Sequence, residues 1–281
     1  MVIEHAPLED ELGDVLEKAM RHAGLNEQSL ATLAKVDAGR IRDAIDYRYD
    51  FTVDELKRLG QVLALNELGV QSLAAGRYPL PEIAGLPFCL YPLRTPHGIG
   101  VANAYIVADC GKNSGVLFDT GSDPVMLRRV WPAIIKRLDG VFITHAETEH
   151  TGGLVEVMKQ FGPVPVFCPL DAKVPGAAAL GEGACIKLGG FEIKALATPG
   201  HAEAHNCYEV RVAKVSGGAP LLVSGDLFFA GSVGGAYFCS KQLRKHLGRL
   251  LAALPEETVV APGHGPLTTI KNERTFNPFT T

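Results

Sequence analysis

The most informative stretch of the chain is Val141-Phe142-Ile143-Thr144-His145-Ala146-Glu147-Thr148-Glu149-His150-Thr151-Gly152-Gly153. Apolar and β-branched residues lead straight into two imidazoles and two carboxylates within six positions. On a loop that follows a strand, the alternate positions His145, Glu147 and Glu149 can converge, and His150 can join them as the next helix begins. The spacing therefore predicts a metal site. The alternative is a solvated loop that carries these side chains by chance.

Four further blocks place a His or an Asp at the end of a predicted strand or in a Gly-containing turn. They are Phe118-Asp119-Thr120-Gly121, Pro199-Gly200-His201, Gly225-Asp226 and Pro262-Gly263-His264. Strand ends fix the positions of metal ligands, and the loops beyond them leave one side open to a substrate. Either His201 or His264 alone would read as an ordinary turn histidine. The repetition along the chain favours one shared metal site.

In this order the five blocks resemble the metallo-β-lactamase superfamily, and the resemblance covers residues 86–281. It implies an α/β fold, the αββα sandwich, in which two mixed sheets lie between outer helices and a dinuclear metal site lies at one edge. The ligands that it implies are His145, Glu147 and His201 for the first metal, Glu149, His150 and His264 for the second, and Asp226 as the bridge. Asp119 would orient a ligand, and His205 is considered as a proton relay.

Two ligand positions depart from the family's usual His-x-His-x-Asp-His motif, because Glu147 replaces the second His and Glu149 replaces the Asp. The implied set is therefore four imidazoles and three carboxylates. Hard oxygen donors favour iron or manganese for the two divalent metal ions, although zinc also accepts carboxylate ligands. A Glu at the position of Glu147 resembles the flavodiiron proteins and related di-iron oxygen-binding sensors.

The C-terminal half resembles the glyoxalase II-like hydrolases instead. The motifs are Gly225-Asp226-Leu227-Phe228-Phe229-Ala230-Gly231 and Gly263-His264-Gly265-Pro266-Leu267-Thr268-Thr269. That family commonly places an Arg after a Gly-x-Val-Gly run, whereas this chain continues with Gly235, Ala236 and Tyr237. The missing cation argues against a glutathione thioester as the substrate.

Two functional hypotheses follow. The favoured one is a dinuclear metal-dependent hydrolase that attacks a small thioester, lactone or other ester with a metal-bridging hydroxide. Asp226 and Asp119 would position the hydroxide and the ligands, and Tyr237 would donate to the oxyanion. The alternative is a di-iron sensor that binds oxygen or nitric oxide and reports it through an N-terminal domain.

The first eighty residues show helical periodicity, with capping residues ahead of four of five expected helices at Asn26, Asp37, Thr52 and Asn66. Five short helices joined by tight turns resemble a helix-turn-helix domain of the phage-repressor type. If it bound DNA, the contacts would be Arg40, Arg42 and Arg48. Residues 1–80 carry nine Lys and Arg against fourteen Asp and Glu, a formal charge of −5. This balance disfavours phosphate contacts, and dimerisation or covering of the main domain is the preferred interpretation.

We therefore predict a helical domain over residues 1–78, a linker over 79–85 that contains two prolines, and the metallo-β-lactamase-fold domain over 86–281. Within the last domain, apolar spacing predicts helices at about 123–137, 151–160 and 240–254.

Composition restricts partners and location. The net charge of −4 indicates no polyanionic partner, and a small-molecule substrate is expected. The six cysteines lack CxxC pairs, which favours reduced, mostly buried thiols. Neither a signal peptide nor an apolar run of membrane-spanning length is apparent. These features predict a cytoplasmic protein without membrane contact, with a homodimer as the other expected association. Histidines outside the motifs, such as His97, read as surface residues.

Overall fold

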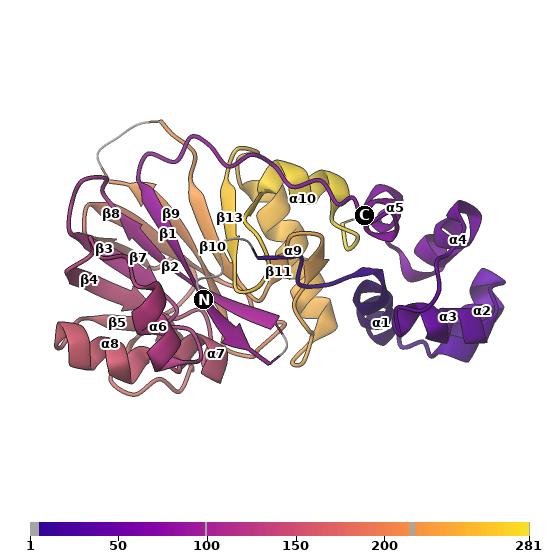
Figure 1. The fold of residues 1–281 in the computed structure, drawn as a ribbon, viewed down its shortest axis with the longest axis horizontal. Coiled ribbons are helices and arrows are strands. Elements are labelled where there is room, and N and C mark those ends of the chain that lie inside the picture. Colours follow the sequence, from indigo (N-terminus) through magenta and orange to yellow (C-terminus); the bar gives the residue numbers. More distant parts are fainter. Residues whose placement is uncertain (1–5, 99, 214–216, 281) are drawn as a thin grey trace.

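The structure is a computed structural model, and it describes residues 6–98, 100–213 and 217–280. Two six-stranded mixed sheets stack face to face (Figure 1). The first has the order β1 (Cys89–His97), β2 (Gly100–Ala108), β3 (Ser114–Phe118), β4 (Arg137–Phe142), β5 (Val166–Pro169) and β6 (Ala178–Leu180). The second has the order β14 (Thr268–Thr269), β13 (Val259–Pro262), β10 (Leu221–Gly225), β9 (Asn206–Val212), β8 (Phe191–Ala197) and β7 (Cys185–Leu188). A short hairpin joins β11 (Phe228–Phe229) to β12 (Ser232–Val233).

Aromatic and aliphatic side chains from both sheets fill the space between them. Phe118 and Phe142 stack with their ring centroids 5.4 Å apart, and Tyr208 of the second sheet lies edge-on to Phe142 at 5.3 Å. The preceding residues Leu117 and Val141 belong to a different cluster, on the opposite face of the first sheet. Because both faces of these strands are buried, the strands read in the sequence as continuous apolar runs.

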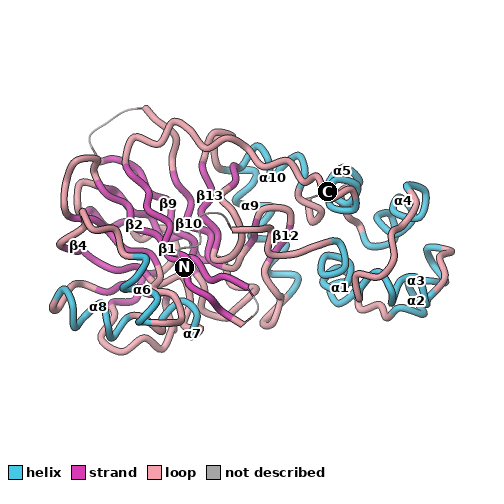
Figure 2. The backbone as a smooth tube through the Cα atoms, in the orientation of Figure 1, coloured by secondary structure: helices cyan, strands magenta, loops and turns pink. Residues whose placement is uncertain are grey.

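Helices cover the outer faces of both sheets and complete the expected αββα sandwich (Figure 2). On the first sheet these are α6 (Pro124–Val130), α7 (Thr148–Thr151) and α8 (Leu154–Phe161), and on the second α9 (Ser240–Ala253) and α10 (Ile270–Phe276). The prediction for 240–254 is confirmed to within one residue.

Two helix predictions need correction. The helix expected over 123–137 ends at Val130, because Trp131 is extended ahead of Pro132 and the chain then enters β4. The helix expected over 151–160 is two helices, α7 and α8, separated by Gly152 and Gly153. A Cβ at Gly153 would lie 2.3 Å from the Thr120 carbonyl oxygen, so a glycine is needed at this close approach.

Five helices precede the sheets, as predicted: α1 (Leu12–Ala23), α2 (Glu27–Ala34), α3 (Ala38–Ile45), α4 (Val53–Leu63) and α5 (Glu67–Ala74). The side chains of Asn26, Asp37, Thr52 and Asn66 each accept a backbone N–H at the start of a helix. These caps leave few orphan donors at the helix starts. The helix-turn-helix resemblance itself stays a prediction.

The helical region lies beside the sandwich, with α1 and α5 nearest to it and α2 to α4 farther away (Figure 1). One apolar cluster continues from α1 and α4 into α9 and α10. At α5 the Asn66 N–H donates to the Pro278 carbonyl at 2.7 Å, and a Cβ at Gly69 would lie 2.1 Å from the Phe276 carbonyl oxygen. Residues 77–86 form no helix or strand. The domain boundaries at 78 and 86 stay predictions.

The expectation of six reduced cysteines is wrong for two of them. Cys89 and Cys110 form a disulfide with their Cα atoms 5.2 Å apart. The antiparallel register of β1 and β2 places Cys89 opposite Ala108, which brings Cys110 alongside. Of the four free cysteines, Cys168 and Cys207 are buried, whereas Cys185 is exposed. Among the described helices none has the length and apolar character needed to cross a bilayer.

Candidate metal centre

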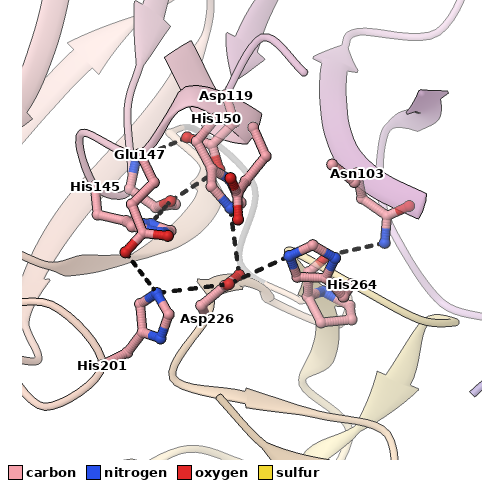
Figure 3. A network of polar contacts seen from close by, with 12 residues as sticks. Asn103, Asp119, His145, Glu147, His150, His201, Asp226 and His264 are labelled. Atoms are coloured by element: carbon pink, nitrogen blue, oxygen red, sulfur yellow. Dashed lines mark hydrogen bonds and ion pairs between the residues drawn. The ribbon is translucent and has the colours of Figure 1, made fainter. Parts of the chain in front are cut away.

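The loops that follow β3, β4, β8, β10 and β13 meet at one edge of the sandwich. The loop after β4 carries His145 and Glu147, and α7 carries Glu149 and His150. His201 follows β8, Asp226 follows β10 and His264 follows β13. Figure 3 shows His145, Glu147, His150, His201, Asp226 and His264 directed toward one another.

The seven predicted ligands lie in two groups whose candidate ligand atoms are within 4.8 Å of one another. The first group is His145, Glu147 and His201, and the second is Glu149, His150, Asp226 and His264. The fold therefore brings together all seven side chains that the sequence predicted to be metal ligands. That they hold metal stays a proposal, which is argued below.

The Asp226 carboxylate lies between the two groups. Its Oδ1 is 3.4 Å from His150 Nε2, and its Oδ2 is 3.3 Å from His264 Nε2. The same Oδ2 is 3.7 Å from Nε2 of His201, which belongs to the first group (Figure 3). One buried carboxylate thus faces both groups, as a bridging ligand must.

Several polar atoms at the centre lack a hydrogen-bond partner among the described residues. His145 Nε2, His150 Nε2 and Asp226 Oδ1 are all buried and make no hydrogen bond. Leaving such atoms unsatisfied costs free energy, and native proteins rarely do so without a ligand. Imidazole nitrogens and carboxylate oxygens arranged in this way fit divalent metal ions.

The opposite ring nitrogen of each histidine is held by the protein. His150 Nδ1 lies 2.9 Å from Asp119 Oδ2, and His145 Nδ1 lies 3.0 Å from Thr144 Oγ1. His201 Nδ1 contacts the Gly235 carbonyl at 2.8 Å, and His264 Nδ1 contacts the Val101 carbonyl at 2.9 Å. A proton on Nδ1 leaves Nε2 as the free atom, so all four rings turn the same nitrogen toward the centre.

Asp119 is a buried carboxylate that binds several partners at once. Its Oδ1 accepts the Thr144 N–H at 2.8 Å, and its Oδ2 accepts the Thr144 hydroxyl at 2.9 Å. The same Oδ2 fixes His150 Nδ1. This geometry supports the predicted role of orienting His150, since Asp119 does not belong to either ligand group.

Burial and neighbouring charges shift the pKa values of the central groups. Burial alone would raise the pKa of Asp226, but the imidazoles of His264 and His150 hold it well below its usual range. Burial alone would lower the pKa of His264, but Asp226 raises it to about 9. Without metal, the second group is therefore an ion pair of imidazolium and carboxylate. A metal ion that binds there must displace a proton.

The two glutamates that depart from the family motif differ in their surroundings. Glu147 is 38% exposed, and its Oε1 lies 3.2 Å from His201 Nε2. The Glu149 Oε2 lies 3.3 Å from His97 Nε2 and faces the second group from the rim. His97, predicted to be a surface residue, is 40% exposed and contacts Glu149 at this rim.

His205 and Tyr237, which were also predicted to act at the site, lie in contrasting surroundings, one buried and one exposed. The Nε2 atom of His205 accepts the Asp226 N–H at 3.2 Å, and its Nδ1 lies 2.8 Å from Thr198 Oγ1. Burial lowers the pKa of His205 to about 3. Both nitrogens are occupied, and His205 holds the backbone of Asp226; its role as a proton relay stays a prediction. Tyr237 is 74% exposed, and its ring lies 5.3 Å from that of His201, at the rim of the site.

Glu9 is a residue at the metal edge that no sequence motif predicted. Its Oε2 lies 3.8 Å from His264 Nδ1, although 255 positions separate the two residues. No motif surrounds Glu9, and only the docking of the N-terminal segment brings it to this edge.

The arginines predicted to contact DNA are paired within the helical region. Arg40 bonds Glu55 at 2.8 Å and Arg42 bonds Glu27 at 2.7 Å. Arg48 bonds Asp43 at 2.8 Å and Asp46 at 2.9 Å. Phosphate contacts would have to compete with these carboxylates.

The chain belongs to the metallo-β-lactamase superfamily, whose family model matches residues 97–264. Members are largely hydrolases, and they bind divalent metals, typically two. An uncharacterised protein of Aquifex aeolicus is 31% identical over 66% of this chain and 94% of its own length. The hydroxyacylglutathione hydrolase of Pseudomonas entomophila is 30% identical over 57% of this chain and 60% of its own length. The crystal structure of TTHA1623 in a di-iron-bound form is 31% identical, with a TM-score of 0.52, over 66% of this chain and 98% of that one.

Proposed function

We propose that this protein is a dinuclear metal-dependent hydrolase of small thioesters, lactones or other esters. The observation that carries the proposal is the position of Asp226, one buried carboxylate that faces two separate groups of ligand-type side chains. The unpaired Nε2 atoms of His145 and His150 support it, because a metal would satisfy them.

We assign His145, Glu147 and His201 to the first metal, Glu149, His150 and His264 to the second, and Asp226 to both. Two divalent ions held there would lower the pKa of a water molecule toward neutrality and polarise a carbonyl oxygen.

The chain's own residues fix the geometry of this reaction. Asp119 holds His150 through Nδ1, and His205 holds the backbone of Asp226, so the ligands are oriented before a substrate arrives. Asp226 sets the spacing between the two ligand groups. The exposed Tyr237 hydroxyl is the group that we assign to donate a hydrogen bond to the developing oxyanion.

The relatives support an ester-type substrate and leave the metal open between iron, manganese and zinc. The name of the Pseudomonas entomophila relative describes a hydrolase of an acyl-glutathione, which is a thioester, and this chain spans 60% of that protein. TTHA1623 has been crystallised with two irons. Together with three carboxylates among seven ligands, this favours iron, with manganese next.

The test is elemental analysis and an optical spectrum of protein purified without oxygen, together with turnover of chromogenic thioesters and lactones. We expect two metal ions per chain and hydrolysis of at least one of these classes. Metal content near two with no hydrolysis in any class would defeat the proposal. Glu147→His should shift the metal preference toward zinc; unchanged metal content would show that Glu147 is not a ligand.

The alternative is a di-iron sensor of oxygen or nitric oxide, and the di-iron form of TTHA1623 is the observation that favours it. Under this alternative the iron-loaded protein has a charge-transfer band that responds to oxygen, and it hydrolyses no ester. DNA binding would be seen as a reduced electrophoretic mobility of genomic fragments in the presence of the protein at low salt. The ion pairs of Arg40, Arg42 and Arg48 count against that last step.

A further inference from the structure

The N-terminal segment Ala6–Glu11 crosses from the helical region to the metal edge of the sandwich. Asp10 forms an ion pair with Lys18 of α1 and accepts a hydrogen bond from the Ser232 hydroxyl of β12. The Lys18 ammonium also donates to the Val233 carbonyl at 2.8 Å. These contacts fix the segment at Asp10, next to Glu9, whose Oε2 lies 3.8 Å from His264 Nδ1.

A pocket of about 440 Å³ lies between this segment and the β1–β2 turn. The helical region lines it with Ala6, Pro7, Leu8, Glu9, Asp10, Asp14 and Tyr47, and the sandwich with His97, Gly98, Gly100, Val101, His264 and Gly265. Its walls therefore come from both parts of the chain.

The pocket adjoins the second ligand group at two points. His264 is both a member of that group and a wall of the pocket. His97, another wall residue, has its Nε2 3.3 Å from the Oε2 of Glu149. The pocket and the second ligand group therefore share His264, and His97 joins the pocket to Glu149.

The charge of the pocket is negative. Lys18 neutralises Asp10, and the remaining carboxylates are Asp14 and Glu9, whose Oε2 lies 3.8 Å from His264 Nδ1. The described residues that line the pocket include neither Lys nor Arg. The Tyr47 hydroxyl donates to Asp14 at 2.5 Å, and the Tyr47 side chain is 59% exposed. Carboxylates beside an exposed aromatic ring favour a cation, which meets both opposite charge and a π face.

We propose that this pocket is the subsite for the part of the substrate away from the scissile bond, and that it selects a cationic group such as a quaternary ammonium. The proposal rests on the hydrolase function proposed above and specifies its substrate class. It also gives the helical region a role in substrate selection.

The first test compares kcat/KM for three thioesters. Acetylthiocholine is cationic, S-(3,3-dimethylbutyl) thioacetate is its neutral isostere, and S-acetyl-3-mercaptopropionate is anionic. We expect the cation to be preferred and the anion to be the poorest substrate. Glu9→Gln should lower the cation-to-neutral ratio by about threefold, whereas Glu17→Gln, on the exposed face of α1, should leave that ratio unchanged. Equal rates for the cation and its isostere, or a ratio unaffected by Glu9→Gln, overturn the proposal.

The second test does not depend on catalysis. Choline and 3,3-dimethyl-1-butanol are titrated into the full chain, and amide resonances are followed by NMR. Choline should shift the amides of Gly98, Gly100 and Gly265 in a saturable way, and the neutral alcohol should not. If choline shifts them while none of the thioesters is hydrolysed, the subsite stands and the hydrolase function fails. If choline shifts none of them, the subsite is wrong whatever the enzyme hydrolyses.

Discussion

Charged and polar side chains are treated differently in the helical region and at the metal edge. Across α2 to α4, Arg40, Arg42 and Arg58 each pair with a carboxylate of the same region. The arginine side chains reach solvent, and Glu55, the partner of Arg40, is buried. At the metal edge, His145, His150 and Asp226 are buried and keep atoms without a hydrogen-bond partner. The helical pairs lie within 15 positions of one another, whereas the metal edge gathers residues from 119 to 264.

This contrast distinguishes polar groups that serve structure from those that serve a ligand. Exposed ion pairs contribute little free energy to folding. The two charges of such a pair neutralise each other, so no bound ligand is needed. Buried polar atoms without partners are costly, and a fold retains them where something else satisfies them. Removing groups from each region tests the contrast.

The largest effect should come from Asp226→Asn. The change removes the carboxylate that faces both groups, so metal affinity should fall by more than about 100-fold, and activity with it. Elemental analysis after dialysis against a metal buffer measures the loss. Asp109→Asn, at an exposed ion pair with Lys112, is the matched control and should keep its metal. Full metal content in Asp226→Asn would mean that Asp226 is not the bridge.

Asp119→Asn should have a smaller effect, because Asp119 orients His150 without belonging to a ligand group. We expect metal affinity or activity to fall by about 10- to 100-fold while the fold is kept. Metal titration measures the loss of affinity, and circular dichroism of the same sample shows whether the fold is kept. If the variant binds metal as tightly as the wild type, Asp119 is not needed to orient His150 for metal binding.

Metal affinity should also depend on pH, because Asp226 raises the pKa of His264 to about 9. The proton must leave before the imidazole binds metal, so lowering the pH below about 9 should weaken binding by up to about tenfold per pH unit. Calorimetry in buffers of different ionisation enthalpy counts the protons released. Release of no proton at pH 7 would contradict the ion pair of His264 and Asp226.

The smallest effect is expected in the helical region. Thr52→Ala removes the capping box of α4, in which Thr52 and Glu55 bond each other's backbone N–H, and should cost about 1 kcal/mol of unfolding free energy. Thermal unfolding measures it, and metal content should not change. Thr32→Ala, at an exposed position of α2, serves as the control. Loss of metal in Thr52→Ala would show that metal binding at the edge of the sandwich depends on the stability of the helical region.

The sequence predicted what local chemistry determines. Helix starts at Asn26, Asp37, Thr52 and Asn66 were recognisable because a side chain caps the helix that immediately follows it. The strand ends that carry the metal-edge residues were recognisable because an apolar run stops at a His or an Asp.

Features set by register or docking were missed. Cys89 and Cys110 lie 21 positions apart, and their disulfide depends on the register in which β1 pairs with β2. The sequence between them does not predict that register. Glu9 and His97 reach the metal edge only because the N-terminal segment and a hairpin turn dock there. The contact of His205 with the Asp226 N–H was not predicted, because 21 positions of sequence separate the two residues.

The contact between α5 and the end of the chain has a consequence for the order of folding. Asn66 binds the Pro278 carbonyl, and Gly69 packs against the backbone at Phe276, so the apolar cluster of the first helices is completed by residues about two hundred positions further along the chain. Domains usually fold from the N-terminus as they emerge from the ribosome. Here α1 to α5 cannot complete their apolar cluster until residues 276–278 have left the ribosome, about two hundred positions after α5.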